Sequence, residues 1–324
     1  MGSFKDKVLV IGACGQLGSE LTTALRQVYG ASQVIASDVH LPAANQLCDN
    51  GIFEKLDVLD ARRLREVLNR HHITQIYVLA AVLSATGEKH PKFAWNLNIN
   101  GLLHVLDAAV EKKIAKIFWP SSIAVFGPHT PPDYTPQYTI TDPNTVYGIS
   151  KQAGELWCNY YYKKHGLDVR SVRYPGLIGY QSMPGGGTTD YAVDIYYKAM
   201  EHKAYECFLS EDTYLPMMYM PDAIRGTLEL MEADADQIRV RTSYNLAGLS
   251  FSPKEIAQSI RTFIPDFQIS YRPDFRQQIA ESWPRSIDDS VARQDWGWKP
   301  AYTLEQMTED MLLHMKHKKA IAEE

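Results

Sequence analysis

The chain has few cysteines and no long hydrophobic run. Its four cysteines, Cys14, Cys48, Cys158 and Cys207, are scattered and form no C-x-x-C pair, which favours reduced thiols in a reducing compartment. No stretch of about 18 or more residues is apolar throughout, so the sequence predicts no membrane-spanning helix. The first apolar segment begins near Lys7 and leaves no room for a signal peptide. We therefore expect a cytoplasmic protein.

Basic clusters and metal-ligand motifs are also missing. The formal net charge is −5, and lysines gather only near the C-terminus, so we do not expect nucleic acid as a main partner. The ten histidines include no H-E-x-x-H motif and the cysteines lack ligand spacing, so we expect no metal centre. No G-x-S-x-G turn of a serine hydrolase is present. The apolar fraction of 45% is ordinary for a globular protein.

A glycine-rich turn follows the first predicted strand. Residues 7–11 are apolar and β-branched, as in a strand covered on both faces, and a helical apolar repeat begins at Leu17. Between them the glycines are Gly12, Gly15 and Gly18. Such glycines let the backbone turn tightly and approach a pyrophosphate at the helix N-terminus. A simple tight turn is the alternative, but the position between strand and helix favours a dinucleotide site that includes Gln16 and Leu17.

Acidic residues end the second and third predicted strands. Asp38 follows the strand predicted over 33–37, about 20 residues after the glycines, where a carboxylate accepts hydrogen bonds from an adenosine ribose. It would repel the 2′-phosphate of NADP, and no arginine follows immediately, so NAD is the favoured cofactor. An exposed loop aspartate is the alternative. Asp57, beside Val58, either caps the next helix or bonds the adenine amine, and both alternatives stay open.

The fourth predicted strand, over 76–81, ends in Leu79, Ala80 and Ala81. Ligands bind beyond the carboxyl ends of strands in open α/β sheets, so the segment 82–88 is expected at the site. A helix from about Phe93 carries Asn98 and Asn100 in its interior, where asparagine is unfavourable. Each asparagine either bonds a neighbouring loop or a catalytic water, or is exposed to solvent.

A Tyr-x-x-x-Lys segment, from Tyr147 to Lys151, leads into a further helix. Residues four apart share one helix face, so the phenol and the ammonium can point into one pocket. A nearby cation favours the phenolate of a tyrosine, whose pKa is otherwise about 10. Alone the spacing is weak, because a solvated lysine beside a half-buried tyrosine is common. Ser122, after the strand predicted over 116–119, adds a hydroxyl that can donate to a substrate oxygen, although Ser-Ser is otherwise turn chemistry.

The helix after Tyr147 has a broad aromatic face. The residues predicted to be buried on this face are Ala153, Leu156, Trp157, Tyr160 and Tyr161. The face is wider than packing on its own domain would need, which favours a helix-pairing homodimer interface. A fully packed core helix is the alternative.

Later segments supply another strand exit and a glycine loop. The strand predicted over 168–174 ends at Tyr174, and the following residues up to Ile178 should line the nicotinamide. A loop of three glycines and two threonines then precedes a helix predicted over 191–200, and it can wrap a small anion such as a carboxylate. A flexible loop is the alternative. A strand over 215–220, a helix over 222–231, a last strand over 243–247, and an irregular lobe with helices from Ser252 and Thr303 complete the chain.

These residues occur in one order on alternating strand–helix units, and together they resemble the extended short-chain dehydrogenase/reductase family, the NAD-dependent epimerase/dehydratase group. The resemblance covers essentially the whole chain. It implies an α/β fold, a doubly wound Rossmann parallel sheet of about seven strands with a small C-terminal α/β substrate lobe. The expected NAD-binding domain covers 1–180 plus about 214–248, and the expected lobe covers about 181–213 plus 249–324. Phe126 stands where the family often has tyrosine.

The resemblance also implies roles for the site residues. Tyr147 is the expected base, Lys151 binds ribose and lowers the tyrosine pKa, and Ser122 positions the substrate hydroxyl. With Tyr147 and Lys151, the expected cofactor-binding residues are Gly12, Gly15, Gln16, Leu17, Gly18, Asp38, Asp57, Val58, Leu79, Ala80, Ala81, Asn98, Tyr174 and Ile178.

Three segments, 83–88, 185–191 and 283–289, are similar to a metal-independent branch of the family that oxidises L-threonine with NAD to 2-amino-3-oxobutyrate. This similarity implies that the substrate-binding residues are Ser84, Ser122, Tyr147, Gly187, Thr188, Thr189 and Trp283. Which threonine contacts the substrate stays open.

Two rival functions remain. A nucleotide-sugar epimerase or reductase shares the fold, but such relatives commonly place asparagine after the Arg-Tyr segment, where this chain has Pro175 and Gly176. A non-catalytic NAD-binding scaffold is the other rival. The complete set of Ser122, Tyr147 and Lys151 argues against a scaffold, because a protein that only binds needs no base.

Overall fold

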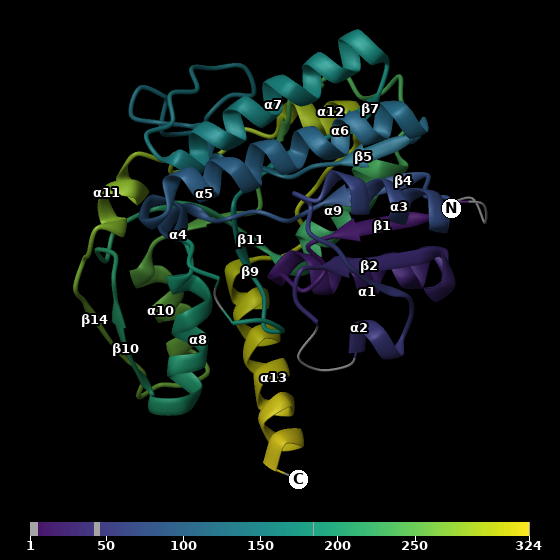
Figure 1. Ribbon diagram of the computed structural model, residues 1–324. Coiled ribbons are helices and arrows are strands. Elements are labelled where there is room, and N and C mark those ends of the chain that lie inside the picture. The colour runs from purple at the N-terminus through teal and green to yellow at the C-terminus, as the bar shows by residue number, and fades with distance from the viewer. Residues whose placement is uncertain (1–5, 42–45, 184, 324) are drawn as a thin grey trace.

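A six-stranded parallel sheet forms the centre of the protein (Figure 1). The computed structural model describes residues 6–41, 46–183 and 185–323. In spatial order the strands are β3 (Phe53–Lys55), β2 (Val34–Asp38), β1 (Val8–Ile11), β4 (Gln75–Val78), β5 (Lys116–Phe118) and β7 (Asp168–Arg170). The strand order reverses between β1 and β4. In sheets of this kind, ligands bind at the carboxyl ends of the strands beside such a reversal.

Helices cover both faces of the sheet. Helices α1 (Gln16–Tyr29) and α9 (Met220–Glu232) pack on one face, where they meet Val8 and Val10 of β1. The other face carries Leu9 and Ile11 and is covered by α3 (Ala61–His71), α6 (Gly101–Lys112) and α7 (Val146–His165). Neighbouring residues of a strand point to opposite faces, so a strand covered twice must be apolar throughout. The prediction for residues 7–11 is therefore confirmed.

A second apolar core lies beside the sheet, to the left of it in Figure 1. It is built mainly from α8 (Tyr191–His202), β10 (Ala204–Cys207), α10 (Pro253–Arg261), β14 (Gln268–Tyr271) and α13 (Leu304–Glu323). The start of α10 was predicted from Ser252, and its side chain accepts a hydrogen bond from the Glu255 amide in a complete capping box. Local capping chemistry thus fixes where this helix begins.

The remaining elements are short and connect these layers. They are η1 (Ala31–Gln33), α2 (Gln46–Asp49), α4 (Ser84–Lys89), α5 (Pro91–Trp95), η2 (Asn96–Asn100), η3 (Ile123–Val125), β9 (Gly176–Ile178), β11 (Leu215–Tyr219), β13 (Leu249–Phe251), α11 (Arg276–Glu281) and α12 (Ser290–Trp296). Among the described residues, no helix combines the length and the apolar character needed to cross a bilayer.

The predicted α/β class is confirmed, but one strand differs. The strand predicted over 168–174 breaks at Ser171 into β7 and β8 (Val172–Tyr174), and β8 pairs with β6 (Ser121–Ser122) and β12 (Tyr244–Asn245). The break occurs because the pairing partner changes: Arg170 accepts a hydrogen bond from Trp119, whereas Ser171 accepts one from Tyr244. The main sheet consequently has six strands instead of about seven.

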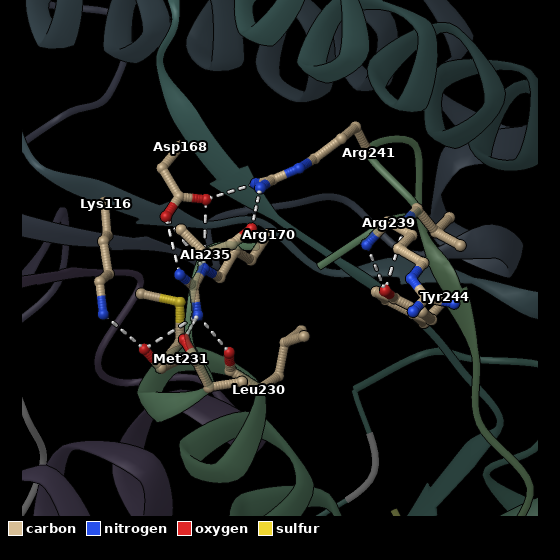
Figure 2. Close-up of polar contacts among 11 residues, drawn as sticks. Lys116, Asp168, Arg170, Leu230, Met231, Ala235, Arg239, Arg241 and Tyr244 are labelled. Atoms are coloured by element: carbon tan, nitrogen blue, oxygen red, sulfur yellow. Dashed lines mark hydrogen bonds and ion pairs between the residues drawn. The ribbon is translucent and has the colours of Figure 1, made fainter. Parts of the chain in front are cut away.

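A buried arginine ties α9 to the edge strand β7 (Figure 2). Arg170 donates to the carbonyl oxygens of Leu230 at 2.7 Å and Ala233 at 2.6 Å, which lack partners within the helix. Asp168 accepts from Arg170 and from Arg241. Burial alone would raise the pKa of Asp168, but the two arginines hold it below its ordinary value. The buried positive charge is therefore compensated.

The aromatic face predicted to be buried on α7 lies at the surface. Leu156 is 61% exposed and Tyr160 is 47% exposed, whereas Gly154 and Cys158 face the sheet. Small residues let α7 approach closely, since a Cβ on Gly154 would overlap the Trp119 ring. Of the five residues predicted on this face, Tyr161 is buried. The alternative of a fully packed core helix is wrong for the single chain.

Candidate active site

A cavity of about 590 Å³ lies at the carboxyl ends of β1 and β4. The residues predicted to bind cofactor that line it are Gly12, Gly15, Gln16, Leu17, Gly18, Leu79, Ala81, Tyr147, Lys151 and Tyr174. All residues predicted to bind substrate line the same cavity: Ser84, Ser122, Tyr147, Gly187, Thr188, Thr189 and Trp283. Segments separated by more than a hundred residues in the sequence thus meet in one space.

The three glycines of the turn have different surroundings. Gly12 has a φ of 89°, and a Cβ there would lie 2.6 Å from the Ala80 nitrogen. A Cβ on Gly18 would overlap the carbonyl oxygen of Gly12. Gly15 is open, because the one atom near its Cβ position is that oxygen at 3.4 Å. The first and third glycines are required by packing, and the second leaves backbone accessible from the cavity.

Asp38 lies at the end of β2, beside the glycine turn. Its carboxylate accepts hydrogen bonds from the backbone amides of Cys14 at 3.0 Å and His40 at 3.2 Å. The Gln16 Nε2 donor is buried in the cavity wall without a hydrogen-bond partner. An open glycine, an unpartnered donor and a helix N-terminus suit a diphosphate, and a fixed acidic group suits an unphosphorylated ribose. The residues therefore fit NAD, and it stays a prediction that Gly12 to Gly18 would hold the pyrophosphate and Asp38 the adenosine ribose.

Asp57 does not cap the helix that follows it. Its carboxylate accepts a hydrogen bond from the Leu59 amide at 2.9 Å, which closes a local turn. The N-cap of α3 is Asp60, whose side chain accepts from the Arg63 amide. The capping alternative for Asp57 is wrong, and a contact with adenine stays a prediction. Val58 beside it is buried and packs against the position of Gly101.

Asn98 bonds a neighbouring loop, one of the alternatives expected for it. From the π-helical segment η2, its side chain accepts from the Val82 amide at 2.8 Å. It also donates to the Val82 carbonyl at 3.1 Å and to the Ser150 hydroxyl at 3.0 Å. Asn98 thereby holds the loop after β4 against α7, behind the cavity wall. Asn100 instead donates to Asn96.

The Ile178 side chain belongs to the second apolar core.

Tyr147, Lys151 and Ser122 meet at the centre of the cavity. Helix α7 begins at an N-cap, Thr145, whose hydroxyl accepts from the Gly148 amide at 3.0 Å. This cap fixes where the helix begins, two residues before Tyr147. The Lys151 ammonium donates to the Pro120 carbonyl at 2.6 Å and lies 5.6 Å from the centroid of the Tyr147 ring.

Burial shifts the pKa values of Tyr147 and Lys151 in opposite directions. Burial raises the pKa of Tyr147 to about 12, and its hydrogen bond with Ser122 offsets this only in part. Burial also lowers the pKa of Lys151 to about 7. The phenol is therefore protonated at neutral pH, because desolvation disfavours the charged phenolate. The lysine is the group that titrates near neutrality.

Hydroxyl groups line the part of the cavity beside the glycine loop. The hydroxyls of Ser84 and Thr188 lie 3.2 Å apart. The Asp190 carboxylate accepts from the amides of Gly186 and Gly187, both at 2.7 Å, and so shapes the glycine loop. The indole N–H of Trp283 is buried without a hydrogen-bond partner. This part of the cavity therefore presents hydroxyl and indole N–H donors to a small polar molecule.

Some cavity residues carried no signal in the sequence. The apolar lining that was not predicted includes Ile123 and Met183, whereas Val82, Leu83, Pro175 and Leu177 lie in segments expected at the site. A buried ion pair between Glu155 and Arg173, directly behind the central trio, was also missed. Its spacing offered one clue, because Glu155 stands one helical turn after Lys151.

Comparison with known proteins agrees with this geometry. Residues 8–247 match the model of the NAD dependent epimerase/dehydratase family. An uncharacterized epimerase/dehydratase of Staphylococcus saprophyticus is 48% identical over 94% of this chain and 96% of the relative.

Two solved structures are also similar over nearly their full length. The holo form of a GalE-like L-threonine dehydrogenase from Cupriavidus necator is 58% identical, with a TM-score of 0.93 over 95% of this chain and 99% of that chain. A monomeric L-threonine 3-dehydrogenase from a metagenome database is 47% identical, with a TM-score of 0.93 over 96% of this chain and 99% of that chain. The present chain belongs to the NAD dependent epimerase/dehydratase family, and its cofactor is NAD.

Proposed function

We propose that this protein oxidises the 3-hydroxyl of L-threonine to 2-amino-3-oxobutyrate with NAD. The observation that carries the proposal is that one cavity is lined by the glycine turn, by Ser122 and Tyr147, and by the hydroxyl groups of Ser84 and Thr188. The names of the two similar solved structures support the same substrate.

The polar groups that line the cavity beside the glycine loop suit an amino acid. A buried donor without a partner costs about 1–3 kcal/mol, and a substrate carboxylate would relieve that cost at Trp283. The hydroxyls of Ser84 and Thr188 can bond the remaining polar atoms of the substrate. Thr188 is 1% exposed and already bonds Ser84, so of the two threonines we assign it the substrate contact.

The residues of the chain divide the chemistry between them. NAD, when bound, supplies the hydride acceptor. Tyr147 removes the proton of the substrate hydroxyl, and Ser122 holds the same oxygen in line with the phenol. Lys151 bonds the cofactor ribose and keeps a positive charge beside the phenol as its proton leaves. The Pro120 carbonyl fixes the direction of the lysine.

The nucleotide-sugar alternative meets a packing obstacle at Gly176. Such relatives commonly carry an asparagine after the Arg-Tyr segment, where this chain has Pro175 and Gly176. A Cβ on Gly176 would lie 2.5 Å from the Met217 sulfur and 2.6 Å from the Thr189 Cβ. A side chain that reaches toward a sugar has no room there, which favours the smaller substrate.

The direct test is NADH formation, followed by absorbance, with L-threonine as substrate. We expect turnover with L-threonine and none with the two control compounds. D-Threonine has the opposite configuration, and L-valine has no hydroxyl group. Calorimetric titration with a nucleotide sugar is the control. Binding of the sugar nucleotide together with no NADH from L-threonine would reject the proposal in favour of an epimerase.

We further infer that the chain forms a homodimer through α7. Its exposed residues Leu156, Trp157 and Tyr160 are large and apolar, and on α5 Phe93 is 55% exposed. Because one similar protein is described as monomeric, the oligomeric state needs its own test.

A cytoplasmic location, as expected from the cysteines, also belongs to this proposal.

Replacing Leu156 by lysine should convert the dimer to a monomer in sedimentation velocity, because a charge would be buried in an apolar interface. We expect the dissociation constant to rise at least about 100-fold, as for a central interface residue. The matched control is Leu313→Lys, on α13, where the leucine is 48% exposed. A wild-type chain that sediments as a monomer at all concentrations contradicts the dimer.

A further inference from the structure

A buried ion pair lies directly behind the central trio. Glu155 of α7 is 4% exposed and Arg173 of β8 is 5% exposed. Two parallel hydrogen bonds of 2.8 Å join the guanidinium to the carboxylate. Such bidentate pairs are geometrically specific. Neither residue lines the cavity, so neither is assigned a contact with cofactor or substrate.

The pair connects several elements that carry the site. The Glu155 carboxylate also accepts from the Ser121 hydroxyl at 2.6 Å, next to Ser122 on β6. Arg173 donates to the Gln137 carbonyl and to the Asn245 side chain, both at 3.1 Å. Removing two charges from water costs free energy, and their mutual attraction often does not offset this cost. A gain in folding stability is therefore a weak explanation for the presence of this buried ion pair.

The carboxylate is also the negative charge next to Lys151. Residues four apart on a helix are neighbours, which places Glu155 one turn beyond the lysine. Burial lowers the Lys151 pKa to about 7, while Cys158 and Glu155 act to raise it. Burial raises the pKa of Cys158, so this thiol is neutral at physiological pH and Glu155 supplies the anion. The other titratable groups around the lysine are Tyr147 and, across the ion pair, Arg173.

We propose that Glu155, oriented by Arg173, is a positioning residue that keeps Lys151 in its ammonium form and holds the Ser121–Ser122 strand against α7. This inference rests on the proposed function, in which the Lys151 ammonium bonds the cofactor ribose. The carboxylate acts through the lysine and the serine strand and does not touch the reacting atoms.

The test is the pH dependence of NAD binding without substrate, measured by calorimetry for the wild type and for Glu155→Gln. A lysine is charged below its pKa, so NAD affinity should be constant at low pH and fall as Lys151 deprotonates. Removing the neighbouring anion should move that fall to lower pH by about one unit. Glu155→Asp keeps the charge and should restore most of the wild-type profile, whereas Lys151→Ala should remove the pH step.

A matched control is Asp168→Asn, which breaks the other buried arginine pair (Figure 2). Asp168 follows the C-terminal end of α7, whereas Lys151 lies near the N-terminal end of that helix. This control should lower thermal stability without moving the pH midpoint. If Glu155→Gln fails to fold because Arg173 is left unpaired, the double variant Glu155→Gln/Arg173→Gln removes both charges. Loss of the more distant cation offsets part of the effect, so its midpoint should move in the same direction as in the single variant but by less. A folded single or double variant with the wild-type midpoint would overturn the inference. Because no threonine is present, failure to oxidise threonine would refute only the proposed function.

Discussion

Tyr147→Phe should lose about 10²–10⁴-fold in turnover while it still binds NAD, because the ring stays and only the proton-accepting oxygen is removed. The phenol lies in the cavity between Ser122 and the Lys151 ammonium. In the free protein the pKa of Tyr147 is raised to about 12 by burial, so a proton must leave the phenol before it can act as a base. At saturating NAD, the wild-type oxidation rate should therefore rise with pH above neutrality. The measurement is steady-state NADH formation combined with calorimetric NAD binding.

Tyr160→Phe is the matched control for this substitution. It removes the same atom from the same helix, but Tyr160 is 47% exposed and faces away from the cavity. We expect wild-type turnover from this control. A Tyr147→Phe protein with more than about a tenth of the wild-type rate would be incompatible with general base catalysis by the phenol.

Gly18→Ala should destabilise the protein by at least about 2 kcal/mol and abolish NAD binding. The new Cβ would overlap the Gly12 carbonyl oxygen and would lie 2.9 Å from the Ala13 Cα. Both are backbone atoms, so helix α1 must shift away from the turn, and overpacking of this kind costs about 1–3 kcal/mol or more. Chemical denaturation measures the loss of stability, and calorimetry measures NAD affinity.

Gly15→Ala is the comparison that separates packing from binding. A Cβ there has its nearest contact at 3.4 Å, so we expect a change in stability of less than about 0.5 kcal/mol. The methyl group would nevertheless occupy space next to the backbone that approaches the pyrophosphate, and NAD affinity should fall at least about tenfold. Equal stability losses in the two variants would contradict the different surroundings of these glycines.

Local signals account for the parts of the site that the sequence predicted. Gly12 and Gly18 mark a turn that only glycine can form, and Tyr147 and Lys151 are joined by the period of one helix. The predicted buried face of α7 is wrong, because large aromatic residues favour a core-facing side in the sequence although most of them lie at the surface. Its sheet-facing side is instead made of small residues such as Gly154, whose contact with Trp119 depends on tertiary packing.

Tertiary contacts also explain what the sequence left out. Glu155 and Arg173 are 18 positions apart on a helix and a strand, and no local pattern joins them. The break at Ser171 depends on pairing with Tyr244, far along the chain. Such features become visible when the fold brings distant segments together.

The packing around Gly176 bears on how this scaffold could acquire another chemistry. The space above that glycine is filled from two directions, by Thr189 ahead of α8 and by Met217 of β11. A mutational route toward sugar nucleotides would have to open both neighbours before a polar side chain at 176 brought any benefit. Each intermediate on that route would first lose the packing of Thr189 and Met217 against residue 176. The proposed specificity for L-threonine and a specificity for sugar nucleotides would therefore be separated by several changes that must occur together.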